Sequence, residues 1–283
     1  MVTALYDTTV RVRRRVRRVA DGIDRVGEDG LFVLRALVST VRAVRSYRTE
    51  TLRVLAEISF GTGVLAAVGG SVAVLGFLTM FAGATVAVQG YDSLGSIGVD
   101  ALTGFLAAYV NVRVVAPVTA GVGLAATVGA GTTAALGAMR ISEEIDALEV
   151  MAIRSLPYLV GTRIVAGLIA VVPLYALSLS TSFLASRVAT VVVLGQSSGV
   201  YDHYFSTFLV PSDVLWSFLQ VLVIGLAVMA IHTLYGYRAS GGPAGVGIAT
   251  GRAVRLSLVT VVLVTLSLSL ALYGATRSIH LAA

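Results

Sequence analysis

The residues best suited to chemistry in this 283-residue chain lie in one short charged segment, residues 140–149. Four of the chain's fifteen acidic residues fall there: Glu143, Glu144, Asp146 and Glu149. Clustered carboxylates suit two tasks, the binding of a hard cation or the recognition of a partner. Their spacing follows a helical face rather than the alternating ligands of a calcium loop. We therefore expect no metal site here, which leaves recognition of a partner as one interpretation.

The same segment predicts a short amphipathic helix. Ser142 is a candidate for the residue that caps its start, and the acids that follow would lie in the first turn, where the helix dipole favours them. Ile141, Ile145, Leu148 and Ala152 form one apolar stripe. Two interpretations stay open, a docking element for a soluble partner and an ordinary solvated loop. Acidity argues against a third, contact with anionic headgroups.

Catalytic motifs are missing from the sequence. The chain has no Lys and therefore no phosphate-binding loop ending in Gly-Lys-Ser/Thr, so it does not hydrolyse ATP by that route. It contains neither His-Glu-x-x-His nor Gly-x-Ser-x-Gly, and it has no Cys. We expect no enzyme activity and no cofactor in the chain itself.

Composition indicates the elements that hold this segment. Hydrophobic residues make up 57% and charged residues 13%, with a mean hydropathy of +0.89, whereas soluble domains carry roughly 25% charged residues. Uncharged runs of 18 or more residues are candidates for membrane spans. The runs at 58–91, 114–139, 164–186, 214–237 and 256–276 predict an all-α integral membrane protein with about five transmembrane helices.

Two further apolar segments are harder to place. Residues 101–112 are too short to cross a bilayer alone, and they either extend the second span past Arg113 or form a separate half-helix. Residues 188–201 contain Gly195 and Gly199 and favour an interfacial or external segment.

Basic residues predict the orientation, because loops rich in Arg stay in the cytoplasm. Twelve of the 21 basic residues precede residue 54, and the loops at 140–163 and 238–255 hold three Arg each. This places the N-terminus and both of these loops in the cytoplasm, in a multi-pass protein of the plasma (inner) membrane.

Residues 1–53 are expected to form a basic cytoplasmic arm and an interfacial helix, preceding a transmembrane domain at 54–283. Six Arg lie within residues 11–18 and suit either topology control or attraction to anionic lipid. Val33, Leu37, Val41 and Val44 share one helical face, as in a helix that lies in the bilayer interface. No aromatic residues interleave the basic tract, so nucleic-acid binding is not expected.

Several segments carry a family resemblance. The chain resembles the MlaE/YrbE permeases, membrane subunits of ABC transporters that work with Mce-domain proteins. The motifs that resemble theirs are Ala116-Pro117-Val118-Thr119-Ala120, Gly129-Ala130-Gly131, residues 136–151, Gln89-Gly90-Tyr91, Pro157 and Arg163.

The resemblance implies an MlaE-like permease fold that dimerises around a lipid pathway and takes up fatty acids, mycolic acids or related lipids. It also implies that a helix at about 141–151 couples the permease to a cytoplasmic ATPase dimer, which holds the ATP and Mg. Carried over to this sequence, the coupling residues are Arg140, Glu143, Glu144, Asp146, Ala147 and Leu148.

Two departures from the family pattern suggest the identity of the dimer partner. Val114 and Thr127 stand where many members have Glu and Arg. Polar groups inside the membrane are costly and usually functional, so we expect a second YrbE-type permease to supply them in a heterodimer. By this resemblance the chain is the B-type subunit of an actinobacterial Mce system.

Arg113 is the ionisable residue nearest to an embedded position. It either extends to the outer headgroups or, as the resemblance implies, contacts the acidic head of a lipid, with Gln89 and Tyr91 as further candidates for the pathway. Two alternatives to a lipid permease are an ion-coupled secondary transporter and a membrane scaffold. The first lacks clear internal repeats and charged midplane residues.

Overall fold

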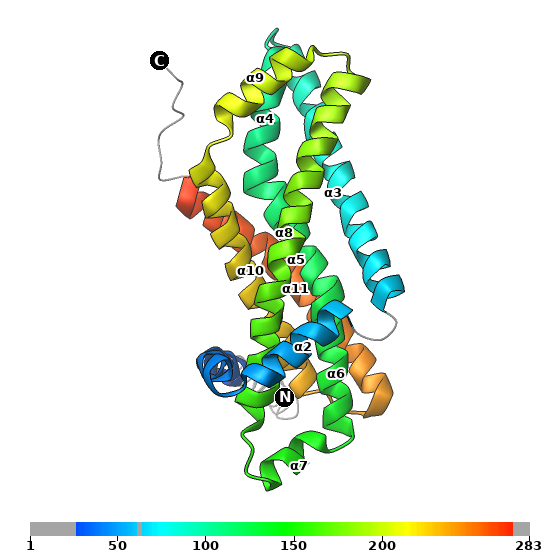
Figure 1. Ribbon diagram of the computed structural model, residues 1–283, viewed down its shortest axis with the longest axis vertical. Helices are drawn as coiled ribbons and strands as arrows, with labels where there is room; N and C mark the ends of the chain where they lie inside the picture. The colour runs from blue at the N-terminus through cyan, green and yellow to red at the C-terminus, as the bar shows by residue number, and fades with distance from the viewer. Residues whose placement is uncertain (1–26, 61–63, 274–283) are drawn as a thin grey trace, which may run out of the picture.

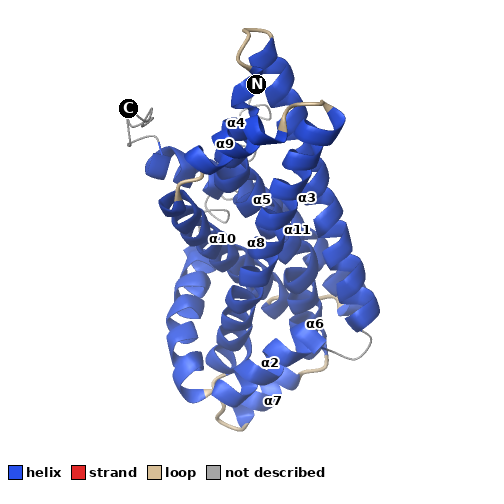
Figure 2. Ribbon diagram, turned by 45° about the horizontal axis from the view of Figure 1, so that its top comes forward, coloured by secondary structure: helices blue, strands red, loops and turns tan. Residues whose placement is uncertain are grey.

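The computed structural model describes residues 27–60 and 64–273, and within them every element is helical. Five helical stretches are long and apolar enough to cross a membrane: Val72–Gly95, Asp100–Ile141, Leu156–Val193, Pro211–Tyr237 and Gly242–Leu272. This confirms the predicted fold class and the number of spans. Figures 1 and 2 show an elongated helical bundle with α7 (Glu144–Val150) at one end and α9 (Ser198–Phe208) near the other.

The second span is one continuous rod. It runs through α4 (Thr103–Val110), α5 (Ala116–Leu124) and α6 (Ala130–Ile141), and π-helical turns at Asn111–Val115 and Ala125–Gly129 join these three helices. Residues 101–112 therefore extend the span and do not form a separate half-helix. At 1.5 Å per residue the rod is about 60 Å long, roughly twice the hydrocarbon thickness, so it reaches beyond the bilayer.

The third span is also longer than predicted. It begins at Leu156 and continues through α8 (Thr162–Val188) to Val193. The expectation that residues 188–201 lie outside the spans was wrong for 188–193, because Gly195 (φ 73°), not Arg187, marks the end of this rod. Helix α9 follows outside the five spans and packs on α4 (Figure 1).

The first and last spans differ from their predicted limits too. Residues 58–60 belong to a separate helix, α2 (Arg48–Phe60), and the span lies in α3 (Val64–Gly95). The last helix, α11 (Gly242–Tyr273), begins fourteen residues before the predicted 256, and residues 274–276 lie outside the described residues. The predicted boundary between residues 53 and 54 falls inside α2.

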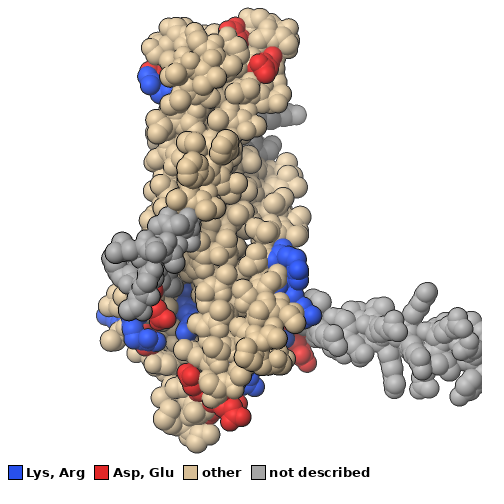
Figure 3. All heavy atoms as spheres, turned by 90° about the vertical axis from the view of Figure 1, so that its right-hand side faces the viewer, with Lys and Arg blue, Asp and Glu red and all other residues tan. Residues whose placement is uncertain are grey.

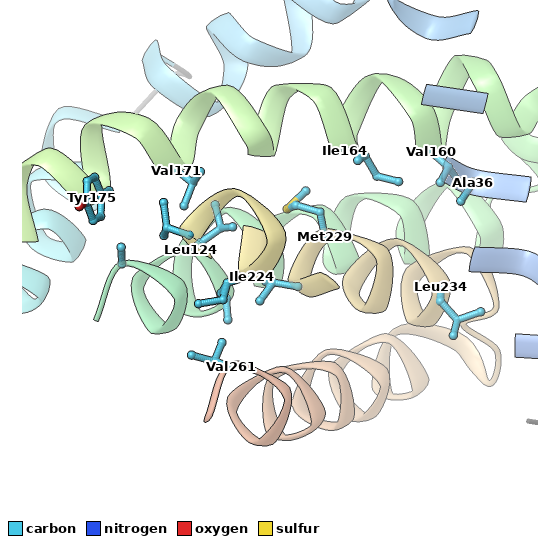
Figure 4. Packing of buried hydrophobic residues seen from close by; sticks show 14 of the residues in the cluster. Ala36, Leu124, Val160, Ile164, Val171, Tyr175, Ile224, Met229, Leu234 and Val261 are labelled. Carbon is cyan, nitrogen blue, oxygen red and sulfur yellow. The ribbon is translucent and has the colours of Figure 1, made fainter. Parts of the chain in front are cut away.

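The core forms where α5, α8, α10 (Pro211–Tyr237) and α11 meet (Figure 4). Leu124, Ile164, Val171, Ile224 and Val261 are fully buried there. Small residues allow the close approach that membrane helices need in place of a hydrophobic drive. A Cβ on Gly129 would lie 2.5 Å from the His232 ring, and one on Gly83 would lie 2.6 Å from the Ser182 carbonyl oxygen.

The N-terminal helix, residues 27–46, packs on the bundle through one face. Phe32, Ala36, Ser39 and Ala43 are buried, whereas Val41 and Val44 are exposed. Val33 and Leu37 are half-buried, so the predicted apolar stripe lies beside the packed face, and its place in the bilayer interface stays a prediction. The basic tract at 11–18 lies outside the described residues.

Charged side chains on the face shown in Figure 3 lie toward the two ends, with an uncharged band between them. More of them lie in the half that contains α7. Such a band is the surface expected of a chain whose middle is surrounded by lipid.

Candidate functional site

The charged segment forms a tight projection between α6 and α8, with α7 at its tip (Figure 1). Two non-glycine residues with left-handed backbone bracket α7, Glu143 (φ 61°) and Ala152 (φ 60°). Each costs roughly 1 kcal/mol or more in backbone strain, and such residues persist where the surrounding structure requires them. The expected cap was wrong, because Ser142 ends α6 and its Oγ donates to the Ala138 carbonyl.

The charged side chains of the projection face outward. Glu143, Glu144, Asp146 and Ala147 are exposed. Arg140 reaches back to Asp146 with a 2.7 Å ion pair, and Ser142 Oγ donates to Glu144 Oε1 at 2.8 Å. These contacts hold the acids over the end of α6 and leave them accessible to a partner.

One side chain attaches the projection to the bundle. Ile145 is fully buried and packs with Leu136 of α6 and Leu159 of the π-helical turn that begins the third span. Met139, Leu148, Tyr158 and Tyr237 complete this small cluster. Of the predicted stripe, only Ile145 and Leu148 face the protein, because Ile141 lies in α6 and Ala152 is the left-handed residue that follows α7.

A polar network anchors the other end of α7, and the sequence analysis did not find it. Ser155 is buried and its Oγ donates to Glu149 Oε1 at 2.6 Å. It also lies 2.9 Å from the Tyr237 hydroxyl at the end of α10. The projection is therefore joined to α6, α8 and α10 together, so a force on α7 reaches three spans.

The contacts of Ile145 and of Ser155 together form what we call the seat of α7. A second charged group lies beside it. On α2, Arg53 donates two hydrogen bonds to Glu50, at 2.6 and 2.9 Å, and this contact lowers the pKa of the Glu50 carboxyl. Arg163 at the start of α8 is buried, and its guanidinium donates to the Leu159 carbonyl at 3.1 Å and to Met139 Sδ at 3.7 Å.

Arg113 occupies the first π-helical turn of the second span. Its guanidinium pairs with Asp213 in the first turn of α10 at 2.6 Å and lies 3.8 Å from the Tyr109 ring centre. The π turn also leaves the Val112 carbonyl available, and Ser217 Oγ donates to it at 2.5 Å. Arg113 thus joins two spans, a role that neither sequence interpretation included, because Asp213 is a hundred residues away.

The other two candidates for the pathway lie on α3. Gln89 is exposed, and its amide donates to Ser93 within the same helix at 3.5 Å. Tyr91 is half-buried. The hydrogen bond of Gln89 does not link it to the Arg113–Asp213 pair. Among the described residues, no group of three or more acidic or histidine side chains is arranged to hold a metal ion.

These features define a multi-pass helical membrane protein whose spans meet at an acidic projection. The sequence profile of the family described as "Permease MlaE" matches residues 60–271, and the chain belongs to that family. It is a permease subunit of an ABC transporter, a multi-pass protein of the inner membrane.

Curated relatives cover much of the chain. A protein of Rickettsia bellii described as a probable ABC transporter permease is 28% identical over 86% of this chain and 89% of its own length. The MlaE permease of an intermembrane phospholipid transport system in Haemophilus influenzae is 26% identical over 69% of this chain and 76% of its own. The chloroplastic protein TRIGALACTOSYLDIACYLGLYCEROL 1 of Arabidopsis thaliana is 26% identical over 67% of this chain and 54% of its own.

Proposed function

We propose that this permease moves lipids and that a partner ATPase drives it by binding α7. The observation that carries the proposal is the seat of Ile145, which fixes an outward-facing acidic helix to the ends of α6, α8 and α10. A lever must be stiff at the point where force enters, and the second and third spans continue past the bilayer as unbroken rods. In this proposal, the end of the bundle that carries α7 lies in the cytoplasm, together with the N-terminal helix.

In this mechanism the ATPase dimer holds ATP and Mg and pushes on α7 when it closes. Glu143, Glu144 and Asp146 offer charge to basic residues of the ATPase, Ala147 leaves room for close approach, and Arg140 holds Asp146 in place. Leu148 belongs to the seat and transmits the motion. The pair of Arg113 and Asp213 connects the second span with α10 at the far end, so movement of one span alters the other.

The test is co-purification of the ATPase with permease variants. Glu143→Arg and Glu144→Arg should each weaken retention of the ATPase, because like charges then face each other. Asp92→Arg provides a matched control, since Asp92 is exposed in the last turn of α3, before the connection that leads to α4. Normal retention of the ATPase by the Glu143→Arg/Glu144→Arg double variant would refute the coupling role of α7.

We further propose a lipid pathway beside Arg113, with Gln89 and Tyr91 at its outer end. Arg113→Ala should lower lipid transport and leave the ATPase bound; unchanged transport would remove Arg113 from the pathway. The named activity of the Haemophilus relative supports phospholipid as cargo, and the resemblance to YrbE permeases supports fatty or mycolic acids moved inward. Mass spectrometry of the lipids that co-purify with the complex separates these classes.

The resemblance also supports a heterodimer with a second YrbE-type permease and assembly with Mce-domain proteins. The test is co-expression of two copies of this chain that carry different tags. If the chain forms a homodimer, purification through one tag will also recover the other tag. An ion-coupled carrier is the competing proposal. Transport that continues without ATP and stops when an ion gradient is removed would support that alternative.

A further inference from the structure

A cavity of 670 Å³ lies between the N-terminal helix and the loop that leads from α7 to the third span. Leu34, Arg35, Val38 and Arg42 line one wall, all from residues 27–46. Ile153 and Arg154 are part of the opposite wall, close to the left-handed Ala152. The cavity thus touches the segment that fixes the position of α7.

The charge of this cavity is positive. Arg35, Arg42 and Arg154 line it, all three are exposed, and in the described part of the chain none of them forms an ion pair. The one acid in the lining, Glu149, is held by Ser155 and Tyr237. Guanidinium groups form bidentate hydrogen bonds with phosphate, so three unengaged Arg suit a phosphate group.

The surroundings of the cavity are apolar. Leu34 and Val38 are 60% and 69% exposed, and Leu31 and Val41 continue the same exposed face of the helix. In water such a face would be unfavourable, but a helix in the bilayer interface covers it with acyl chains. Arg35 and Arg42, two turns apart, lie next to this face, so positive charge and apolar surface meet at the edge of the cavity.

We propose that this cavity binds the phosphate headgroup of an anionic phospholipid, whose acyl chains lie along Leu31, Leu34, Val38 and Val41. This lipid stays with the permease and is distinct from the cargo. It would join the N-terminal helix to the loop after α7 and so stiffen the seat of α7. The proposal rests on the membrane placement of the proposed function but not on the coupling role of α7.

The test measures lipid binding to the purified full-length permease in detergent, without ATPase, by native mass spectrometry. Dioleoyl phosphatidylglycerol is titrated against dioleoyl phosphatidylcholine, which has the same chains and no net charge. The native protein should prefer phosphatidylglycerol. Arg35→Gln/Arg42→Gln should lower its affinity by about tenfold or more, since each Arg near an anionic lipid contributes on the order of 1 kcal/mol.

Arg45→Gln/Arg255→Gln is the matched control. It removes two exposed Arg that do not line the cavity, one of them from the same helix, and should change the affinity by less than about twofold. Arg154→Gln tests the opposite wall, in case the double variant fails to fold. Residues 11–18 are unchanged in every variant, so their attraction to lipid cancels in the comparison.

Four results would overturn the proposal. The first is equal affinity for the two lipids, and the second is an equal loss in the control pair, which would indicate diffuse surface charge. The third is a cavity variant that keeps its lipid affinity and loses the ATPase, which would make the cavity a protein-binding site. Competition by millimolar inorganic phosphate as strong as that by phosphatidylglycerol would show a free anion, not a lipid, as the ligand. The Glu143→Arg/Glu144→Arg variant should keep its lipid affinity, so this proposal and the coupling role can fail separately.

Discussion

Replacement of Ile145 by Ala should release α7 from the bundle. The side chain is fully buried among Leu136, Leu159 and their neighbours, and loss of its three outer carbons should cost about 2–5 kcal/mol, the usual range for Ile→Ala in a core. A helix of seven residues does not form alone in water, so this contact maintains it. The cost should therefore appear as local opening of α7, with the spans intact.

The magnitude can be measured by hydrogen exchange. At 1.4 kcal/mol per factor of ten, a loss of about 2 kcal/mol raises the open population about 30-fold. The amides of Ala147 and Met151 report it, because they donate to the Glu143 and Ala147 carbonyls inside the projection. Exchange in α5, α8 and α10 should stay at its native rate.

Val150→Ala is the control, since Val150 lies on the same helix and is 88% exposed. Its exchange should match that of the native protein. If Ile145→Ala leaves the protection of Ala147 and Met151 within about threefold of the native value, the seat does not hold α7 and the argument for a lever fails. Faster exchange throughout the spans would show global unfolding instead of a local release.

Three further predictions concern the spans and α2. Arg113→Gln and Asp213→Asn should each destabilise the protein by about 1–3 kcal/mol, and the double variant by little more than either alone, because the two side chains share one ion pair; additive shifts in the unfolding temperature would argue against this. On α3, Gly83→Ala should destabilise by about 1–3 kcal/mol, since its Cβ would meet the Ser182 backbone, whereas Gly76→Ala, with nothing within 4 Å, should be neutral or stabilising in the same melting assay. Arg53 lowers the pKa of Glu50 below 4.5, so the pair stabilises the fold above that pH and the gain is lost as the pH falls; Glu50→Gln should flatten the dependence of unfolding temperature on pH below about 5, and an unchanged slope would contradict the assignment.

Much of the fold followed from hydropathy, because a lipid solvent imposes long apolar segments. The number of spans and the exposed acids of residues 143–146 were predicted from residue type and spacing. The limits of the spans were less accurate. Residues 58–60 and 188–193 are uncharged and mostly apolar, so composition did not assign them to α2 or to the third span.

The predicted amphipathic helix forms as α7, but its packing partners were not predicted. Ile145 was recognised as part of an apolar stripe, but its partners Leu136 and Leu159 come from two other helices. Ser142 has the residue type of a helix cap, yet it ends α6 because Glu143 adopts a left-handed conformation. Local patterns of this kind show which faces are apolar and leave open what covers them.

By itself the sequence determined that the chain is helical, lies in a membrane and presents carboxylates between two spans, since each property depends on residue types that are near one another in the chain. Only the tertiary structure decided that Glu149 reaches Ser155 and Tyr237, that Arg113 pairs with Asp213, and that Arg35, Arg42 and Arg154 line one cavity. Several of these contacts join residues about a hundred positions apart. They depend on how the helices pack and on the π-helical turns that rotate one part of a span relative to the next.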